Sequence, residues 1–355
     1  MKTTHRVFFK DSYDMNEVES NSIDLIITSP PYPMIDMWDL HFSNSNDEIK
    51  QALEDGNGKK AFNIMHNQLE KVWKEVGRVL KVGGIVCINI GDATRTIKNN
   101  FQLFPNHVEI TNFFYKNGFN ELPCIIWRKP TNIPNKFLGS GMLPPNAYVT
   151  LEHEYILIFR KGKAKRKIPP KSEIRYNSAF FWEERNNWFS EIWEDIRGIS
   201  QNLLKENNNQ RNLRDRSAAF PLELPYRLIN MYSIYGDTVL DPFWGTGTTS
   251  LAAVISMRNS IGYEINSEFM EFFKKKINNA KKLNNDINKY RLNNHIKFIE
   301  KYRKEGKDIK YKSNYYKFPV ITNQETEFLL YSIKNYEENR NKFVIHYEKF
   351  SFNIE

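Results

Sequence analysis

The sequence predicts an α/β protein with a mostly parallel sheet flanked by helices. Short runs rich in β-branched residues alternate with segments of helical periodicity, as expected where helices join parallel strands. The runs are almost continuously apolar, which is typical of strands buried on both faces. A chain of 355 residues is also long enough to bury a large core.

The alternation defines seven strands and five helices. We expect the strands at residues 5–9, 23–27, 84–90, 122–127, 154–159, 238–240 and 259–263. We expect the helices at residues 62–80, 104–117, 225–235, 248–257 and 267–282. The first helix ends at "KVGG", where glycine closes a helix and a strand follows. Three stretches interrupt the pattern: an insert at about 36–61, a basic and aromatic segment at 161–216, and an extension at 284–355.

The positive charge is concentrated in one stretch. The formal net charge is +9, and residues 160–175 hold eight basic side chains against one acid, Glu173. A local excess of this kind suits a polyanionic partner, although a solvated loop has the same composition.

Cysteine content and hydropathy indicate the compartment. The two cysteines, Cys87 and Cys124, both lie in apolar runs, which favours a reducing environment without a disulfide framework. The sequence has no recognisable signal peptide and no apolar run long enough to cross a bilayer. We therefore expect a soluble cytoplasmic protein with no membrane partner.

A glycine-rich turn lies at residues 236–255, "GDTVLDPFWGTGTTSLAAVI". A strand leads into Asp241, a turn holds Gly245 and Gly247, and a helix begins at Thr248. Glycines permit close backbone approach, and a helix start offers free N–H groups. Glu264 ends the next strand, near the spacing at which an acid meets the ribose of a bound nucleotide.

The turn matches neither common phosphate-binding loop. No Gly-Lys-Ser/Thr follows it, and position 250 is Ser where a dinucleotide fingerprint has Gly. A ligand with an adenosine and an amino acid but no phosphates fits better, and S-adenosylmethionine answers that description. An ordinary strand–turn–helix connection is the alternative. A cofactor half of this kind needs a third strand, and the chain after residue 282 offers no convincing one. The early segment "HRVFFKDS" (residues 5–12) can supply it, and Asp11 near its end can accept from an adenine amino group.

The stretch "IDLIITSPPY", at residues 23–32, ends a buried strand on two prolines. Together with the glycine-rich turn it resembles the β-class DNA amino-methyltransferases, in which the catalytic motif precedes the cofactor motif. The family's catalytic signature, Ser/Asn/Asp-Pro-Pro-Tyr/Phe, matches residues 29–32, and its Asp-Pro-Phe-x-Gly-x-Gly-Thr signature matches residues 241–248. "AAFPLELPYRLI" from Ala218 and "LEHEYILIFRKGK" from Leu151 resemble flanking segments of the family.

The resemblance implies a Rossmann-like, S-adenosylmethionine-dependent methyltransferase fold with a seven-stranded sheet and permuted motif order. It divides the chain into a catalytic half (1–160), a target-recognition region (161–216), a cofactor half (217–283) and a C-terminal extension of uncertain role (284–355). It implies catalytic roles for Ser29, Pro30, Pro31 and Tyr32. It implies cofactor contacts by Asp11, Phe220, Pro221, Asp241, Phe243, Gly245, Thr246, Gly247, Thr248 and Glu264. The basic run adds DNA contacts by Lys163, Lys165, Arg166, Lys167 and Arg175.

The chemistry explains the catalytic motif. A nucleobase amine is a poor nucleophile because its lone pair is delocalised into the ring, and acceptors on its N–H groups favour a pyramidal nitrogen. The Ser29 hydroxyl and the Pro30 carbonyl are the expected acceptors, held by a rigid backbone. Tyr32 is expected to stack on the base once it leaves the duplex.

The resemblance favours one reaction and leaves others open. "TSPPY" in this family usually accompanies cytosine N4, so we expect a site-specific methyltransferase on double-stranded DNA, with an independently acting restriction endonuclease as its counterpart. Adenine N6 is the main alternative. An RNA amino-methyltransferase and a non-catalytic DNA-binding protein with a vestigial cofactor site are the others.

Three weaker signals do not change this interpretation. Pro123-Cys124 resembles a cytosine-C5 nucleophile but lies in an apolar run, so a buried cysteine is expected. His153 lacks the second histidine of a zinc motif, so no metal is expected. Asp92 either lines the cofactor cleft or caps the segment that follows it.

Overall fold

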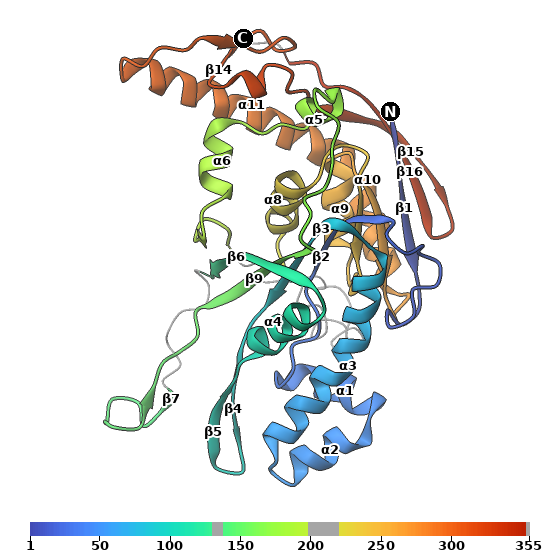
Figure 1. The fold of residues 1–355 in the computed structure, drawn as a ribbon, viewed down its shortest axis with the longest axis vertical. Coiled ribbons are helices and arrows are strands. Elements are labelled where there is room, and N and C mark those ends of the chain that lie inside the picture. The colour runs from blue at the N-terminus through green and yellow to red at the C-terminus, as the bar shows by residue number, and fades with distance from the viewer. Residues whose placement is uncertain (130–137, 198–219, 353–355) are drawn as a thin grey trace.

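A ten-stranded sheet forms the centre of the computed structural model, which describes residues 1–129, 138–197 and 220–352 (Figure 1). The strand order is β10-β6-β9-β3-β2-β11-β12-β1-β16-β15. Its strands are β1 (Lys2–Phe8), β2 (Ile23–Thr28), β3 (Leu80–Ile90), β6 (Phe119–Arg128), β9 (His153–Lys161), β10 (Ile192–Trp193), β11 (Thr238–Asp241), β12 (Asn259–Tyr263), β15 (Tyr331–Asn339) and β16 (Lys342–Lys349). The seven predicted strands are adjacent in this order, so the α/β fold class is confirmed, and β10, β16 and β15 extend the sheet beyond seven.

Five central strands are parallel. β3, β2, β11, β12 and β1 pair in parallel with their neighbours, so their carboxyl ends lie at one edge of the sheet. β1 pairs with β12 from His5 opposite Ser260 to Phe8 opposite Tyr263. The expectation that the N-terminal segment completes the cofactor half of the sheet is therefore confirmed.

β2 is buried on both faces. All six of its residues are buried, with Leu25 and Ile27 in one hydrophobic cluster and Ile26 in another. This explains its unbroken apolar sequence, because successive side chains of a strand point to opposite faces.

Helices cover the two faces. α3 (Gly58–Val79) and α4 (Asn106–Lys116) contribute to the cluster that contains Ile26, and α8 (Glu223–Tyr232), α9 (Thr248–Ile255) and α10 (Phe269–Asn278) contribute to the other. Among the described residues, no helix combines the length and apolarity that a membrane span requires.

The predicted insert at 36–61 is helical, and two hairpins were not predicted. The insert contains η1 (Asp36–Trp38), α1 (Asp39–Ser45) and α2 (Asp47–Glu54), and it ends in the first turn of α3. The hairpins are β4 (Ala93–Ile97) with β5 (Asn100–Phe104), and β7 (Leu138–Gly139) with β8 (Ala147–Tyr148). Both project from the lower end of the sheet in Figure 1, and Phe101 stacks on Tyr148 with ring centroids 4.5 Å apart.

The prediction of a single helix at 267–282 is wrong. Two helices occupy this region, because the chain turns at Asn279 and α11 (Ala280–Lys304) then continues past the predicted boundary at 283/284. Polar residues occupy much of the buried face of α11, so the sequence shows no apolar stripe there. Asn284, for example, donates to the Ile255 carbonyl oxygen at 2.9 Å and accepts from the Ile333 N–H at 3.1 Å.

The C-terminal extension holds part of the predicted target-recognition region. Its remaining elements are β13 (Tyr311–Lys312), β14 (Pro319–Val320), η2 (Asn323–Glu325), β15 and β16. Between residues 161 and 197 the structure contains α5 (Glu173–Asn177), α6 (Trp182–Trp188) and β10. Arg291 of α11 forms a bidentate, buried ion pair with Glu184 of α6, with N–O distances of 2.6 and 2.7 Å. Residues 198–216 of the predicted region lie outside the described residues.

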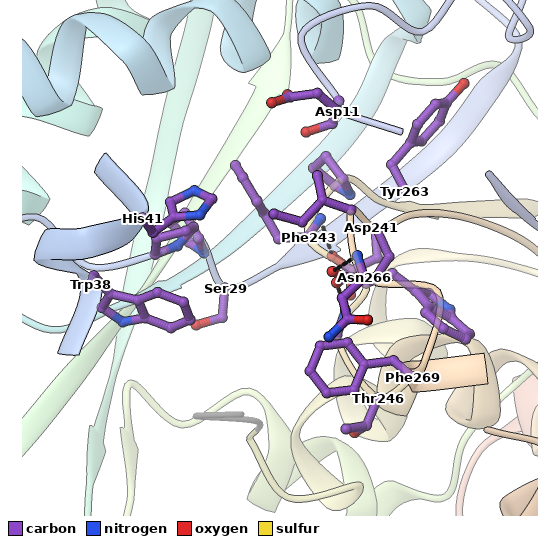
Figure 2. A pocket seen from close by; sticks show the side chains of 18 of the residues that line it. Asp11, Ser29, Trp38, His41, Asp241, Phe243, Thr246, Tyr263, Asn266 and Phe269 are labelled. Atoms are coloured by element: carbon purple, nitrogen blue, oxygen red, sulfur yellow. Dashed lines mark hydrogen bonds between the residues drawn. The ribbon is translucent and has the colours of Figure 1, made fainter. Parts of the chain in front are cut away.

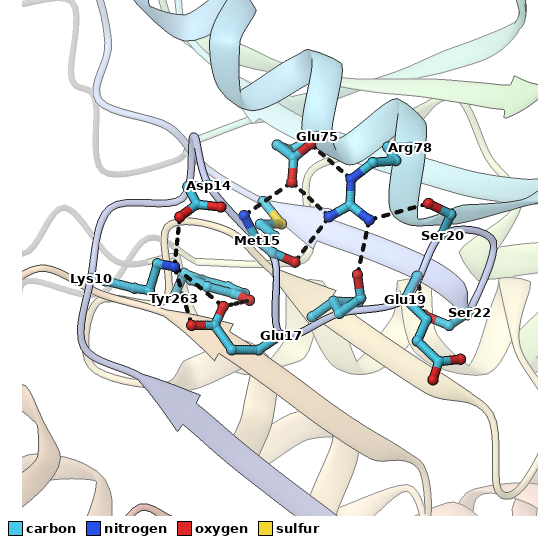
Figure 3. A network of polar contacts seen from close by, with 11 residues as sticks. Lys10, Asp14, Met15, Glu17, Glu19, Ser20, Ser22, Glu75, Arg78 and Tyr263 are labelled. Atoms are coloured by element: carbon cyan, nitrogen blue, oxygen red, sulfur yellow. Dashed lines mark hydrogen bonds and ion pairs between the residues drawn. The ribbon is translucent and has the colours of Figure 1, made fainter.

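A polar network holds the segment between β1 and β2 (Figure 3). Arg78 of α3 donates to the backbone oxygens of Met15 at 2.9 Å and Val18 at 3.0 Å. Lys10 pairs with Glu17 at 3.1 Å, and Glu17 accepts from the Tyr263 hydroxyl at 3.1 Å. These contacts fix the segment that carries Asp11 against α3 and the end of β12.

Candidate functional site

The two motifs line one cavity of about 280 Å³ at the carboxyl edge of the parallel strands. From the predicted set it is lined by Asp11, Ser29, Pro30, Pro31, Tyr32, Phe220, Asp241, Phe243, Gly245, Thr246, Thr248 and Glu264. Pro221 and Gly247 are the two predicted cofactor residues that do not line it. The structure thus brings together segments more than 200 residues apart in sequence.

Asp241 joins the two motifs directly. Its carboxylate accepts from the Thr28 hydroxyl at 2.7 Å, the Thr249 hydroxyl at 2.7 Å and the Phe243 N–H at 3.0 Å. Burial raises the pKa of Asp241 from 3.8 to about 6. Because its described partners are internal, Asp241 connects the end of β2 to the start of α9 while it also lines the cavity.

Glu264 shapes the glycine-rich turn. One carboxylate oxygen accepts from the Gly245 N–H at 2.9 Å, and the other accepts from the Asn266 N–H at 2.9 Å. Burial raises the pKa of Glu264, and the two backbone donors oppose that shift. Each carboxylate oxygen keeps a further lone pair, so Glu264 can accept from a ligand as well.

Gly247 is required by packing rather than by contact with the cavity. Its φ is 74°, and a Cβ there would lie 2.5 Å from Phe273 Cδ2 and 2.7 Å from Trp244 Cζ2. Behind the turn, Lys276 donates to the Thr246 carbonyl oxygen at 2.9 Å, and burial lowers the pKa of Lys276 to about 8. Both contacts fix the backbone of the turn.

Ser29 and Tyr32 belong to a hydrogen-bonded network that the sequence did not predict. The Ser29 hydroxyl donates to the Tyr32 hydroxyl at 3.1 Å, which donates to Glu154 Oε2 at 3.0 Å. Asn89 Nδ2 donates to the Tyr32 hydroxyl at 2.8 Å and to Glu154 Oε2 at 2.6 Å. Lys129 forms an ion pair with the other oxygen of Glu154. The only sequence signals were a polar residue in each of two apolar strands, β3 and β9.

Several cavity residues were missed because they lie in the insert, beside the motifs, or at positions of the cofactor motif to which the resemblance assigned no contact. Figure 2 shows Trp38 and His41 of the insert beside Ser29 on one side, with Thr246 and Phe269 on the other. The remaining unpredicted lining residues are Lys10, Ser12, Met37, Leu40, Asn44, Pro242, Trp244, Tyr263, Ile265 and Asn266. α2 follows helical apolar spacing at Ile49, Ala52 and Leu53, but the lining residues lie before it, and their closeness to the proline motif was the available signal.

The predicted DNA contacts do not lie at the cavity. β9 is antiparallel to β3, with Tyr155 opposite Ile90 and Arg160 opposite Ile85, so the basic run follows at the amino edge of the parallel strands. Arg166 pairs there with Asp237 and, at 3.3 Å, with Asp24.

Five residues of β2 separate this edge from Ser29, a distance of roughly 17 Å at about 3.3 Å per residue. Asp237 and Asp24 engage the guanidinium of Arg166, and contact of the basic run with DNA stays a prediction. The side chains of Lys163, Lys165, Lys167 and Arg175 are exposed.

Of the two roles considered for Asp92, the structure supports capping. Its carboxylate accepts from the His107 N–H at 3.1 Å in the first turn of α4, and it does not line the cavity. Cys124 also lies outside the cavity lining, and burial raises the pKa of its thiol.

Comparisons with known proteins agree with this geometry. The model of the N6_N4_Mtase family, described as DNA methylase, matches residues 23–275. The chain is 53% identical over 352 residues to the type II methyltransferase M.MthZI of Methanothermobacter thermautotrophicus, covering 98% of this chain and 96% of that protein. It is 51% identical over 298 residues to the type II methyltransferase M.MjaI of Methanocaldococcus jannaschii, covering 81% and 95%.

Solved structures share the fold. TTHA0409 of Thermus thermophilus, determined in complex with S-adenosyl-L-methionine, matches with a TM-score of 0.59 and 30% identity, covering 77% of this chain and 92% of that one. The cytosine-N4-specific PvuII DNA methyltransferase matches with a TM-score of 0.51 and 20% identity, covering 77% and 87%. At that identity the second match shows the fold alone.

Proposed function

Because the chain belongs to the N6_N4_Mtase family of DNA methylases, we propose that it methylates the exocyclic N4 amine of cytosine in double-stranded DNA. The methyl donor is S-adenosylmethionine, and the biological setting is a type II restriction–modification system, as for the relatives named above. An independently acting endonuclease would be its counterpart. The observation that carries the proposal is the single cavity shared by Ser29 and the glycine-rich turn.

The turn fits S-adenosylmethionine. A Cβ added at Gly245 would meet nothing closer than the Phe243 carbonyl oxygen at 3.9 Å, so the backbone opens onto the cavity. Glu264 would accept from the ribose hydroxyls with its remaining lone pairs, and Asp11, exposed at the rim, would accept from the adenine amine. When bound, the cofactor supplies an electrophilic methyl group on a positively charged sulfur. Phe220, Phe243 and Phe269 give the cavity apolar walls that exclude water from the reaction.

The proline motif would hold the target amine. The Ser29 hydroxyl and the Pro30 carbonyl oxygen accept its two N–H groups, so the nitrogen lone pair is free to point across the cavity. A base can reach Ser29 only after leaving the stack, because its amine is otherwise inside the duplex. Fixing the amine and the methyl donor in one cavity supplies catalysis by proximity and orientation, without a covalent intermediate.

The unstacked base needs an aromatic neighbour, and Tyr32 and Trp38 are the aromatic candidates near Ser29. Tyr32 is the residue that the sequence motif suggested. Its hydroxyl is held by three described partners, so the ring that lines the cavity is fixed in position. Trp38, which lies in the insert, provides a second ring beside Ser29.

The choice of cytosine rests on the motif. Thr28-Ser29-Pro30-Pro31-Tyr32 is the form that usually accompanies cytosine N4 in this family, whereas an Asp in place of Ser29 usually accompanies adenine N6. Adenine N6 is the alternative, since Ser29 can accept from either amine.

The proposal also assigns a function to each region of the chain. Residues 1–160 would form the catalytic half, 161–216 the target-recognition region and 217–283 the cofactor half. Residues 284–352 would support target recognition, because α11 holds α6 through the Arg291–Glu184 pair.

Mass spectrometry of nucleosides tests the proposal. Duplex DNA and, in a parallel reaction, RNA are treated with the protein and a CD₃-labelled cofactor and then digested. The DNA is expected to contain labelled N4-methyldeoxycytidine. Labelled N6-methyldeoxyadenosine would establish the alternative base. Tight duplex binding without label in any nucleoside would indicate a non-catalytic DNA-binding protein, and label in RNA alone would indicate an RNA methyltransferase.

A further inference from the structure

A chain of hydrogen bonds leads away from the proposed position of the target amine. Ser29 donates to Tyr32 at 3.1 Å, and Tyr32 donates to Glu154 Oε2 at 3.0 Å. Ser29 and Tyr32 line the cavity, whereas Glu154 lies behind them on β9 with its side chain 13% exposed. We call Ser29, Tyr32 and Glu154 the relay chain.

The Glu154 carboxylate determines which group donates in each hydrogen bond of the relay chain. An ionised carboxylate only accepts, so Tyr32 must donate its single proton to Glu154. Tyr32 can then only accept from Ser29, and Ser29 has no second proton to donate. The Ser29 oxygen therefore faces the cavity as an acceptor, which is the role that an amine N–H requires.

Asn89 reinforces this polarity. Its amide nitrogen donates both protons, one to Tyr32 and one to Glu154, which fixes the orientation of the amide. Asn89 is 3% exposed, and its Oδ1 has no hydrogen-bond partner in the described structure. A buried amide that leaves its own oxygen unpaired is costly, which indicates that holding Tyr32 and Glu154 is its function.

Resting on the function proposed above, we propose that Glu154 receives the proton that methyl transfer releases, delivered through Ser29 and Tyr32. The amine lone pair forms the new bond to the methyl carbon, and the electron pair of the broken carbon–sulfur bond stays on sulfur. The nitrogen then carries a positive charge and loses one proton to the Ser29 oxygen. Ser29 passes its own proton to Tyr32, and Tyr32 passes its own to Glu154.

The surroundings of Tyr32 suit this transfer. Burial and the nearby Glu154 carboxylate raise the pKa of Tyr32 well above its ordinary value. The side chain is therefore a neutral phenol at physiological pH, able to accept one proton as it gives up another. Lys129 pairs with the carboxylate oxygen that Tyr32 does not contact, so it does not compete with Tyr32 for the oxygen that takes up the proton.

Two variants separate proton transfer from packing. Glu154→Gln keeps the size of the side chain but cannot take up a proton, and Lys129→Gln removes the ion pair while leaving the carboxylate. General-base assistance is typically worth about 100- to 10,000-fold. With saturating cofactor and pre-bound duplex DNA, we expect the single-turnover rate constant to fall by at least about 100-fold in Glu154→Gln but by less than about 5-fold in Lys129→Gln.

Chemical rescue supplies a readout that a structural role would not give. Glu154→Ala leaves a space that formate can enter, so added formate is expected to restore part of its rate but not that of Glu154→Gln. Tyr32→Phe keeps the ring, breaks the relay chain and is expected to lose rate to a similar extent, without rescue. Cofactor affinity should stay within about 2-fold of wild type in the Glu154 variants, because Glu154 does not line the cavity.

The outcomes distinguish this proposal from the proposed function. A wild-type enzyme that methylates cytosine, with Glu154→Gln equally active or no worse than Lys129→Gln, would overturn the relay chain alone. A wild-type protein that transfers no methyl group would overturn both proposals. If Glu154→Gln does not fold, as judged by thermal melting, Tyr32→Phe replaces it in the comparison. A Tyr32→Phe rate equal to that of the wild type would overturn the relay chain, and a loss of at least about 100-fold would support it.

Discussion

Replacing Glu264 by Gln should weaken cofactor binding while leaving the catalytic motif intact. The two carboxylate oxygens of Glu264 accept from the N–H groups of Gly245 and Asn266, each at 2.9 Å. A glutamine has one oxygen, so one of these N–H groups would face an NH₂ group instead. A hydrogen bond to a charged acceptor contributes about 1.5–3 kcal/mol, so weakening the one that Glu264 is proposed to accept from the ribose corresponds to a dissociation constant raised roughly 10- to 150-fold.

Isothermal titration with S-adenosylmethionine measures this change, and Ser29→Ala is the matched control. Ser29 lines the same cavity, but its proposed partner is the target amine, so its removal should leave cofactor affinity within about 2-fold. The same variant should lower the single-turnover methylation rate by at least about 10-fold, because the amine loses its acceptor. Unchanged affinity in Glu264→Gln, or equal losses of affinity in both variants, would refute the division of the cavity into two halves.

Three further predictions concern the contacts of Asp241 and the position of the basic run. Thr28→Val should lower the free energy of unfolding in urea by about 1–3 kcal/mol, because the buried Asp241 loses a donor; an unchanged midpoint would contradict this. Between pH 3.8 and about 6 the folded protein holds a proton on Asp241 that the unfolded chain has lost. The wild type should therefore lose stability relative to Asp241→Asn as pH rises through that window, by roughly 1.4 kcal/mol per pH unit, and parallel urea-stability curves would argue against it. Replacing Lys163, Lys165 and Lys167 together by Ala should leave the salt dependence of DNA affinity nearly unchanged, because the run lies at the amino edge; a slope reduced by about 0.9 per lysine would instead establish phosphate contacts.

The elements predicted correctly are those in which the local pattern and the tertiary environment agree. β2 is a continuous apolar run because both of its faces are buried, and the glycine-rich turn is recognisable because Gly247 must accommodate Trp244 and Phe273. The pairing of β1 with β12 was predictable because the cofactor half needed a third strand. The segment after residue 282 did not offer one, whereas the N-terminal segment did.

The elements that escaped prediction depend on long-range polar contacts. α11 buries Asn284 and Arg291 through hydrogen bonds to distant segments, so it lacks an apolar stripe. The basic run carried the right composition for DNA, but its position follows from the antiparallel direction of β9, which composition does not encode. Asn89 and Glu154 are polar residues near the ends of strands β3 and β9, and the sheet pairing brings them to Tyr32.

A crystal structure with S-adenosylmethionine bound would test the central claim most directly. We predict that the ribose lies against Glu264 and that the methyl group faces Ser29 across the shared cavity. A cofactor bound elsewhere, or in this cavity with its methyl group directed away from Ser29, would contradict it.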